Sequence, residues 1–119
     1  MQAAVAETPR PRAPSHPNEF DLVRIRRGLE ARVRYRYVTP RVSGVDGGYL
    51  IQSPCCSRNI DAQGGIIDVA LMLFDGVSGV WQLFARDHER GTWELAGVHP
   101  RLVEMIGEIN SDPERVFWQ

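Results

Sequence analysis

Reactive side chains are most concentrated in residues 53–65, where the chain reads Ser-Pro-Cys-Cys-Ser-Arg-Asn-Ile-Asp-Ala-Gln-Gly-Gly. The thiols of Cys55 and Cys56 lie close in sequence to the guanidinium of Arg58, and a nearby positive charge stabilises a thiolate. This pattern is compatible with a redox-sensitive or metal-responsive site. The alternative is that both cysteines pack as small hydrophobic residues. Either way we expect two free thiols, at least one partly shielded, because adjacent cysteines do not form a conventional intrachain disulfide.

Metal and phosphoryl chemistry gain little support from the spacing of these residues. A structural zinc ion needs about four ligands, and the histidines that could join the cysteines, His16, His88 and His99, are remote in sequence. The Cys-x5-Arg loop of cysteine phosphatases is absent, since Arg58 follows the cysteines too closely. The sequence therefore predicts no metal ion, no cofactor and no catalytic residue.

Asp68 interrupts an apolar run from Ile66 to Phe74. Strand alternation places it on the face shared with Ala70, Met72 and Phe74. An unpaired buried carboxylate would cost several kcal/mol. We therefore expect Asp68 either at a solvated end of the strand or paired with an arginine. A catalytic acid would need a carboxylate or histidine partner, which the sequence does not identify.

Arginines at every second position predict one basic face of a strand that ends at Pro40. They are Arg32, Arg34 and Arg36, and they alternate with Val33, Tyr35 and Tyr37. This basic face is a candidate surface for an acidic partner. Because the tyrosines fall on the opposite face, no base-stacking platform accompanies the charge, and nucleic acid is the less favoured partner. The alternative is a solvated face that balances the protein's own acidic half.

The composition fits one globular domain. The chain has 119 residues, of which 43% are hydrophobic and 24% charged, and its net charge is −1, which excludes wholesale disorder. Residues 1–60 carry ten arginines against five acidic residues, a net charge of +5, and residues 61–119 carry four against ten, a net charge of −6. The first residues lack the basic and apolar regions of a signal peptide, and no apolar run approaches the length of a membrane span. We expect a cytoplasmic protein with no membrane partner.

The proline-rich residues 1–17 predict a disordered arm, because such a segment buries too little surface to offset its conformational entropy. Asn18 then predicts the N-cap of a helix, with Glu19 and Asp21 in its first turn and Gly28 where its apolar stripe weakens. The folded domain is therefore expected over residues 18–119.

Further strands are predicted at 49–52, 66–74, 80–86 and 92–96. Asp46-Gly47 is typical of the turn of a hairpin that leads into the first of these strands. The last two strands predict a second hairpin, with Asp87-His88-Glu89-Arg90 near its tip. These four residues have the types found in catalytic sites, but polar residues are usual at such a tip.

A C-terminal helix follows Pro100, because Leu102, Met105, Ile106 and Ile109 recur at the spacing of one helix face. Helix, about five antiparallel strands and helix together predict an α+β fold in which the N-terminal and C-terminal helices pack on the sheet.

The chain from about residue 66 to 119 resembles a family of small bacterial proteins that is a domain of unknown function. The resemblance rests on Val80-Trp81-Gln82-Leu83-Phe84, Arg86-Asp87, Thr92-Trp93, the C-terminal helix and the final Phe117-Trp118. The turn after Arg86-Asp87 is longer than in that family, and the loop Ser53-Pro54-Cys55-Cys56-Ser57-Arg58-Asn59 is not part of the pattern that carries the resemblance. The resemblance implies a fold and no activity.

These observations favour a small non-catalytic binding module whose basic N-terminal half meets an acidic protein or, less favoured, nucleic acid. Two alternatives stay open: a thiol-dependent redox or metal-responsive protein, and an enzyme whose motif is not recognisable. The candidate binding residues are Arg32, Arg34, Arg36, Cys55, Cys56, Arg58 and Asp68.

Overall fold

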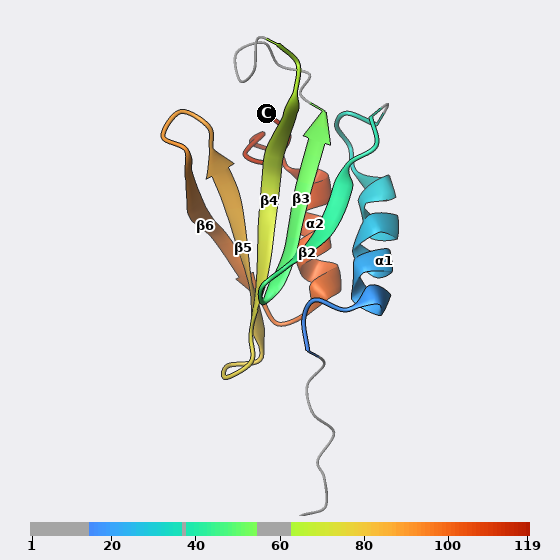
Figure 1. The fold of residues 1–119 in the computed structure, drawn as a ribbon, viewed down its shortest axis with the longest axis vertical. Helices are drawn as coiled ribbons and strands as arrows, with labels where there is room; N and C mark the ends of the chain where they lie inside the picture. Colours follow the sequence, from blue (N-terminus) through green and yellow to red (C-terminus); the bar gives the residue numbers. More distant parts are fainter. Residues whose placement is uncertain (1–14, 37, 55–62) are drawn as a thin grey trace, which may run out of the picture.

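A computed structural model describes residues 15–36, 38–54 and 63–119 of the chain (Figure 1). Along the sequence, the elements are α1 (Glu19–Gly28), the 3-10 helix η1 (Leu29–Ala31), β2 (Arg41–Val45), β3 (Gly48–Pro54), β4 (Ile66–Asp75), β5 (Val80–Asp87), β6 (Thr92–His99) and α2 (Leu102–Ser111). The predicted α+β class with two terminal helices on a five-stranded antiparallel sheet is confirmed. In the described residues, no helix has the length and apolar character that crossing a membrane requires.

The sheet is a meander, in which each strand pairs with its neighbour in sequence, in the order β2-β3-β4-β5-β6. Asp46 and Gly47 form the turn between β2 and β3, as predicted, and the positive φ of 82° at Gly47 explains the glycine there. The next residue, Gly48, lies so close to the carbonyl oxygen of Met72 that a Cβ would overlap it. Local turn chemistry and a close strand approach therefore fix this hairpin.

Both helices cover the same face of the sheet (Figure 1). Helix α1 contacts β2, whereas α2 contacts β5 and β6. The helices meet where Gly28 approaches Ile106, and a Cβ at Gly28 would lie 3.0 Å from the Ile106 Cγ2 atom. The core lies between this helix layer and the sheet, and it contains the helix residues Ile25, Leu29, Met105 and Ile109 together with Tyr49, Ile51, Met72 and Leu83 from the strands.

The helix ends follow the sequence signals. The Asn18 side chain accepts a hydrogen bond from the Asp21 backbone N–H at 2.8 Å, which confirms the predicted N-cap of α1. Helix α2 ends at Ser111, and its C-cap residue Asp112 adopts a left-handed conformation with a φ of 34°. After α2, Phe117 and Trp118 are buried in the core and form an aromatic anchor at the end of the chain.

The prediction of a strand through Arg32, Arg34 and Arg36 is wrong. The chain continues from α1 into η1 and then runs in turns to β2, so the first strand begins after Pro40 instead of ending there. Alternation fails because Arg32 is buried, whereas Val33, expected on the inner face, is 67% exposed. Tyr35 adopts a φ of 53°, which a strand does not allow.

Candidate functional site

The predicted site residues fall into three groups. Cys55, Cys56 and Arg58 lie outside the described residues. The three arginines of the expected basic face lie in the segment between η1 and β2, and Asp68 lies in β4. In the described residues, Arg32, Arg34 and Arg36 therefore do not form one site with Asp68.

The Arg32 side chain turns inward and binds the backbone around it. Its Nη1 donates to the carbonyl oxygen of Leu29 at 2.8 Å, and its Nη2 donates to that of Tyr35 at 2.9 Å and to that of Val38. The guanidinium also lies over the Trp118 ring, 5.5 Å from its centroid. Arg32 is only 5% exposed, and its Nε has no hydrogen-bond partner among the described residues.

No carboxylate of the described chain forms an ion pair with Arg32, which is unusual for a cation at this depth. Burial lowers the pKa of the Arg32 guanidinium below its usual value, the charge of Arg36 lowers it further, and Glu30 opposes both. The backbone carbonyls accept from the two terminal nitrogens of Arg32, and no carboxylate of the described residues balances its positive charge.

A pocket of about 310 Å³ opens beside this guanidinium. Arg26 of α1, Arg32 and Arg36 line it, with Glu30 as the one acidic residue of its described lining. Val38, Thr39, Pro40 and Val42 form the rest of the lining. We call this the arginine pocket. Its surplus of positive charge and its volume suit a small anionic group.

Arg34 does not belong to the arginine pocket. Its Nε donates to the carbonyl oxygen of Asp112 at 3.3 Å, at the end of α2. Arg26 lines the arginine pocket in place of Arg34, because α1 continues directly into η1 and the two helices place Arg26 near Arg32. Sequence reasoning missed Arg26 because its proximity to Arg32 depends on a helical path that the two-residue pattern did not indicate.

Asp68 lies on the sheet face opposite the helices. The prediction that it shares a face with Ala70 is wrong, because Val69 is an extra residue between the pairs Ile51–Ala70 and Gln52–Asp68. This bulge reverses the alternation. Gln52 Nε2 donates to Asp68 Oδ1 at 3.0 Å.

Arg86 Nε lies 3.7 Å from Asp68 Oδ2, so the carboxylate is paired with an arginine. The Asp68 side chain also stays 28% exposed, which matches the other expectation of a solvated position. The Arg86 guanidinium stacks over Trp93, 5.0 Å from the ring centroid. These hydrogen-bond and ion-pair contacts give Asp68 a structural role on this face of the sheet.

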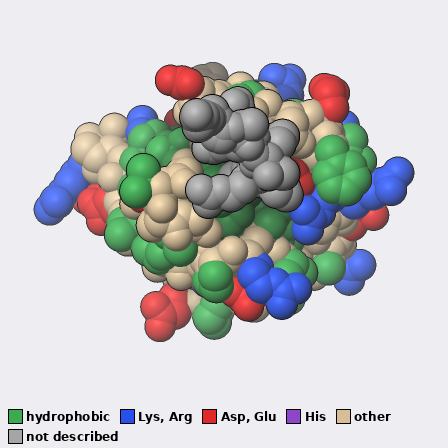
Figure 2. Space-filling view, turned by 90° about the horizontal axis from the view of Figure 1, so that it is seen from below, with side chains coloured by type: hydrophobic (Ala, Val, Ile, Leu, Met, Phe, Trp, Pro, Cys, Tyr) green, Lys and Arg blue, Asp and Glu red, His purple; other side chains and the backbone are tan. Residues whose placement is uncertain are grey.

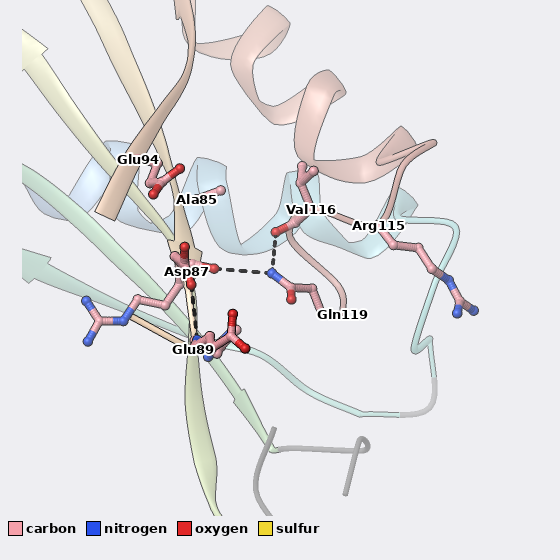
Figure 3. A pocket seen from close by; sticks show the side chains of 9 residues that line it. Ala85, Asp87, Glu89, Glu94, Arg115, Val116 and Gln119 are labelled. Atoms are coloured by element: carbon pink, nitrogen blue, oxygen red, sulfur yellow. Dashed lines mark hydrogen bonds between the residues drawn. The ribbon is translucent and has the colours of Figure 1, made fainter. Parts of the chain in front are cut away.

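A cleft of about 580 Å³ lies between the β5–β6 turn and the residues after α2 (Figure 3). Gln119 Nε2 spans it, donating to the carbonyl oxygens of Arg86 at 3.2 Å and Val116 at 2.8 Å. The charged residues Asp87, Glu89, Glu94, Arg86 and Arg115 mix both signs around its wall. This mixture gives the cleft no preference for an anion or a cation.

His88 in this cleft has a buried Nε2 without a hydrogen-bond partner among the described residues. Burial lowers the pKa of His88, the charge of Arg86 lowers it further, and Asp68 and Asp87 oppose the shift. A neutral imidazole is a suitable base. The described lining offers it no hydroxyl or thiol to activate, and Asp87 serves the turn by accepting from the Glu89 backbone N–H at 3.1 Å.

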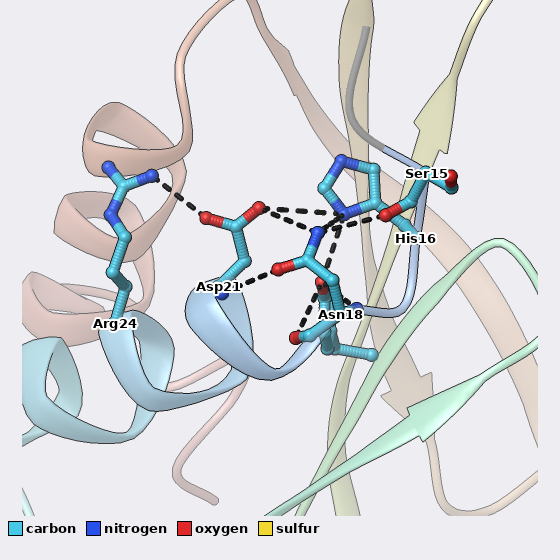
Figure 4. A network of polar contacts seen from close by, with 6 residues as sticks. Ser15, His16, Asn18, Asp21 and Arg24 are labelled. Carbon is cyan, nitrogen blue, oxygen red and sulfur yellow. Dashed lines mark hydrogen bonds and ion pairs between the residues drawn. The ribbon is translucent and has the colours of Figure 1, made fainter.

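A second polar network joins the start of α1 to the sheet (Figure 4). His16 Nδ1 lies 2.9 Å from the Tyr49 hydroxyl oxygen, which also accepts the Asn18 backbone N–H at 3.0 Å. Asp21 accepts from the Asn18 side chain at 3.1 Å and from Arg24 Nη1 at 2.9 Å. Each polar group is thus satisfied by its neighbours.

The His16 ring is enclosed by aromatic side chains. Its centroid lies 5.0 Å from that of Phe74 and 4.6 Å from that of Trp81, and the side chain is 4% exposed. Although His16 belongs to the segment expected to be an arm, it packs on the sheet. The buried His16 ring and its hydrogen bonds therefore anchor the start of α1 to the sheet.

The described residues contain no cluster of three or more His, Cys, Asp or Glu side chains that could hold a metal ion. Seen from the end of the molecule in Figure 2, basic and acidic side chains are intermixed around the outline. At this end of the molecule, the opposite net charges of the two sequence halves therefore do not form separate basic and acidic sides. The local charge of the arginine pocket says more about a binding site than the charge of either half does.

The chain belongs to the family described as a domain of unknown function, DUF3024, whose model matches residues 13–119. The resemblance seen in residues 66–119 is thereby confirmed, and it extends through α1 to the segment that holds His16. No curated protein and no solved structure matches the chain.

Proposed function

We propose that this member of the family is a non-catalytic binding module that holds a carboxylate of an acidic protein segment in the arginine pocket. The observation that carries the proposal is the Arg32 guanidinium, 5% exposed and without an ion pair in the described chain. A bound carboxylate would supply the counter-ion. The carbonyl bonds of Arg32 hold the guanidinium in place before the ligand arrives, which reduces the entropy lost on binding.

The exposed arginines complete the site. Arg26 and Arg36 are solvent-exposed and line the same pocket, so their guanidinium groups are available to donate to the two oxygens of a carboxylate. Val38, Thr39, Pro40 and Val42 form an uncharged wall of the same pocket, and hydrogen bonds beside such a wall are electrostatically stronger than in bulk water.

Nucleic acid fits the arginine pocket less well than an acidic protein segment does. A nucleic acid backbone presents phosphates in a line and favours a basic track with aromatic platforms for its bases. Arg34 is committed to the Asp112 carbonyl oxygen, which interrupts the row, and the pocket volume of about 310 Å³ suits one side chain.

The test is an NMR titration of the full chain with a hexaglutamate peptide, with a single-stranded oligonucleotide as the comparison ligand. We expect saturable shifts at Arg26, Arg32 and Arg36 with the peptide. The double variant Arg26→Gln/Arg36→Gln should weaken binding by about tenfold or more, because it removes two charge-assisted donors. Binding should also weaken as salt is raised.

The matched control is Arg90→Gln/Arg101→Gln, which removes the same charge at two exposed positions outside the pocket. It should leave the affinity for the peptide nearly unchanged. Equal losses in both double variants would reduce the effect to overall charge and overturn the proposal. Tighter binding of the oligonucleotide than of the peptide would also overturn it.

We further propose that the module works in the cytoplasm, where thiols stay reduced, because its two cysteines are adjacent and do not suit a structural disulfide. Fractionation of cells expressing the tagged full chain tests this location, and recovery outside the cytoplasm would contradict it.

A further inference from the structure

The sheet face opposite the helices is unusually apolar, and its side chains form rows that cross the sheet. The strand register aligns one residue from every strand in a central row: Ser43, Leu50, Leu71, Phe84 and Leu95. A second row, two residues along the strands, contains Val45, Gly48, Leu73, Gln82 and Val98. We call these ten residues the open face, because no described helix packs on them.

The open face is accessible to a partner. Leu95 is 57% exposed and Val98 is 52% exposed, and both lie on the edge strand β6. Leu50, Leu71, Leu73 and Phe84 are partly exposed and do not belong to the buried core. Contiguous apolar surface of this kind marks interaction sites on monomeric proteins.

We propose that the open face binds a second copy of this chain, so that two sheets stack face to face in a reversible dimer. The ten residues include no charged side chain, so identical faces meet without like-charge repulsion. Leu and Phe side chains from both copies would interdigitate in a layer about 10 Å thick, the usual spacing of packed sheets.

A polar row borders the open face on one side and limits how far the apolar contact extends. It contains Arg41, Gln52, Asp68, Arg86 and Trp93. Asp68 and Arg86 are paired at 3.7 Å, so their charges are largely balanced before any partner arrives. The arrangement of an apolar centre and a polar border is that of a protein interface.

The size of the face sets the expected strength of the dimer. The five strands lie about 4.8 Å apart, and the two rows of the open face together with the polar border row lie about 6.6 Å apart. With that border included, the face spans roughly 24 by 20 Å, or about 500 Å² per copy. The total of about 1,000 Å² lies at the lower end of specific interfaces. We therefore expect a dissociation constant in the micromolar range or weaker.

The experiment is sedimentation equilibrium of the full chain over a concentration range from micromolar to millimolar. We expect the wild type to shift from monomer to dimer with concentration. Leu95→Glu places a charge at the edge of the open face and should weaken the dimer by about tenfold or more. Val103→Glu in α2 is the matched control, since Val103 is 56% exposed and lies on the helix layer.

Circular dichroism melting of both variants checks that each is folded. A wild type that stays monomeric at millimolar concentration overturns the proposal. The open face would then be a candidate binding surface for a different protein. An unchanged dimer in folded Leu95→Glu, or equal weakening by Val103→Glu, also overturns it. Because no arginine-pocket residue lies on the open face, Arg26→Gln/Arg36→Gln should dimerise as the wild type does.

Discussion

Trp118 donates its backbone N–H to the Asp112 carboxylate at 2.8 Å, so the chain after α2 folds back onto the end of the helix that precedes it. The same carboxylate accepts the backbone N–H groups of Val116 at 2.8 Å and Phe117 at 3.2 Å. Asp112 is 1% exposed. One buried side chain thus organises the whole aromatic anchor.

We expect Asp112→Ala to lower the free energy of unfolding by about 2–4 kcal/mol, because several buried N–H groups lose their acceptor. Asp112→Asn keeps one acceptor oxygen and tolerates the left-handed backbone, so it should lose less. Urea denaturation monitored by tryptophan fluorescence measures both changes. Equal losses in the two variants would contradict an acceptor role for the side chain.

Arg32→Met should lower the free energy of unfolding by about 1–3 kcal/mol, because three backbone carbonyls lose their donor. The loss is limited, because the variant no longer buries a cation. Arg34→Met removes one hydrogen bond of 3.3 Å. It should lower the free energy of unfolding by less than about 1 kcal/mol, close to the effect of an ordinary surface substitution. Chemical denaturation compares the two. A larger loss in Arg34→Met would contradict the central position assigned to Arg32.

The stability of the protein should fall as the pH drops below 6.5. Burial lowers the pKa of His16 below its usual 6.5, which Asp21 opposes, and burial with the charge of Arg86 also lowers that of His88. The unfolded chain therefore takes up protons first, so the contribution of both histidines is fully present above pH 6.5 and declines as pH falls toward their folded-state pKa values.

NMR titration of the histidine ring signals checks this directly. We expect the midpoints of His16 and His88 below 6.5 in the folded protein. A stability profile of His88→Asn should show a smaller decline between neutral and acidic pH than the wild type. A midpoint above 6.5 for either ring would contradict the burial that the structure shows.

Where local chemistry fixes an element, the sequence was sufficient to predict it. Asn18 caps α1 through its own side chain, and Gly47 supplies the positive φ of 82° that the β2–β3 turn requires. The spacing of Leu102, Met105 and Ile109 placed the buried face of α2 correctly. Each of these signals acts over a few residues, and no distant contact competes with it.

The segment after η1 could not be predicted in this way. Its backbone is fixed by distant partners, since the Val33 N–H donates to the Asn110 carbonyl oxygen at 3.0 Å and the Tyr35 hydroxyl to that of Gln119 at 2.9 Å. These tertiary bonds override a two-residue alternation. The same holds for Asp68, because the bulge at Val69 reverses the alternation without leaving any signal in residue types.

The arginine pocket was foreseen only as a basic stretch of chain. The sequence identified Arg32 and Arg36, but not that Arg32 is buried among carbonyls or that Arg26 joins it. The path of the backbone decides which of several arginines is buried, and the residue types in this segment do not indicate that path.

The meander order of the sheet also has a consequence for how the chain folds. Every strand pairs with its neighbour along the chain, so the sheet assembles through local hairpins with a small entropy of loop closure. We expect the helix layer to form later, because the bond from Asn110 Nδ2 to the Gly28 carbonyl oxygen joins residues 82 positions apart. Substitutions in the β4–β5 hairpin should therefore slow folding, whereas substitutions at the α1–α2 contact should mainly accelerate unfolding.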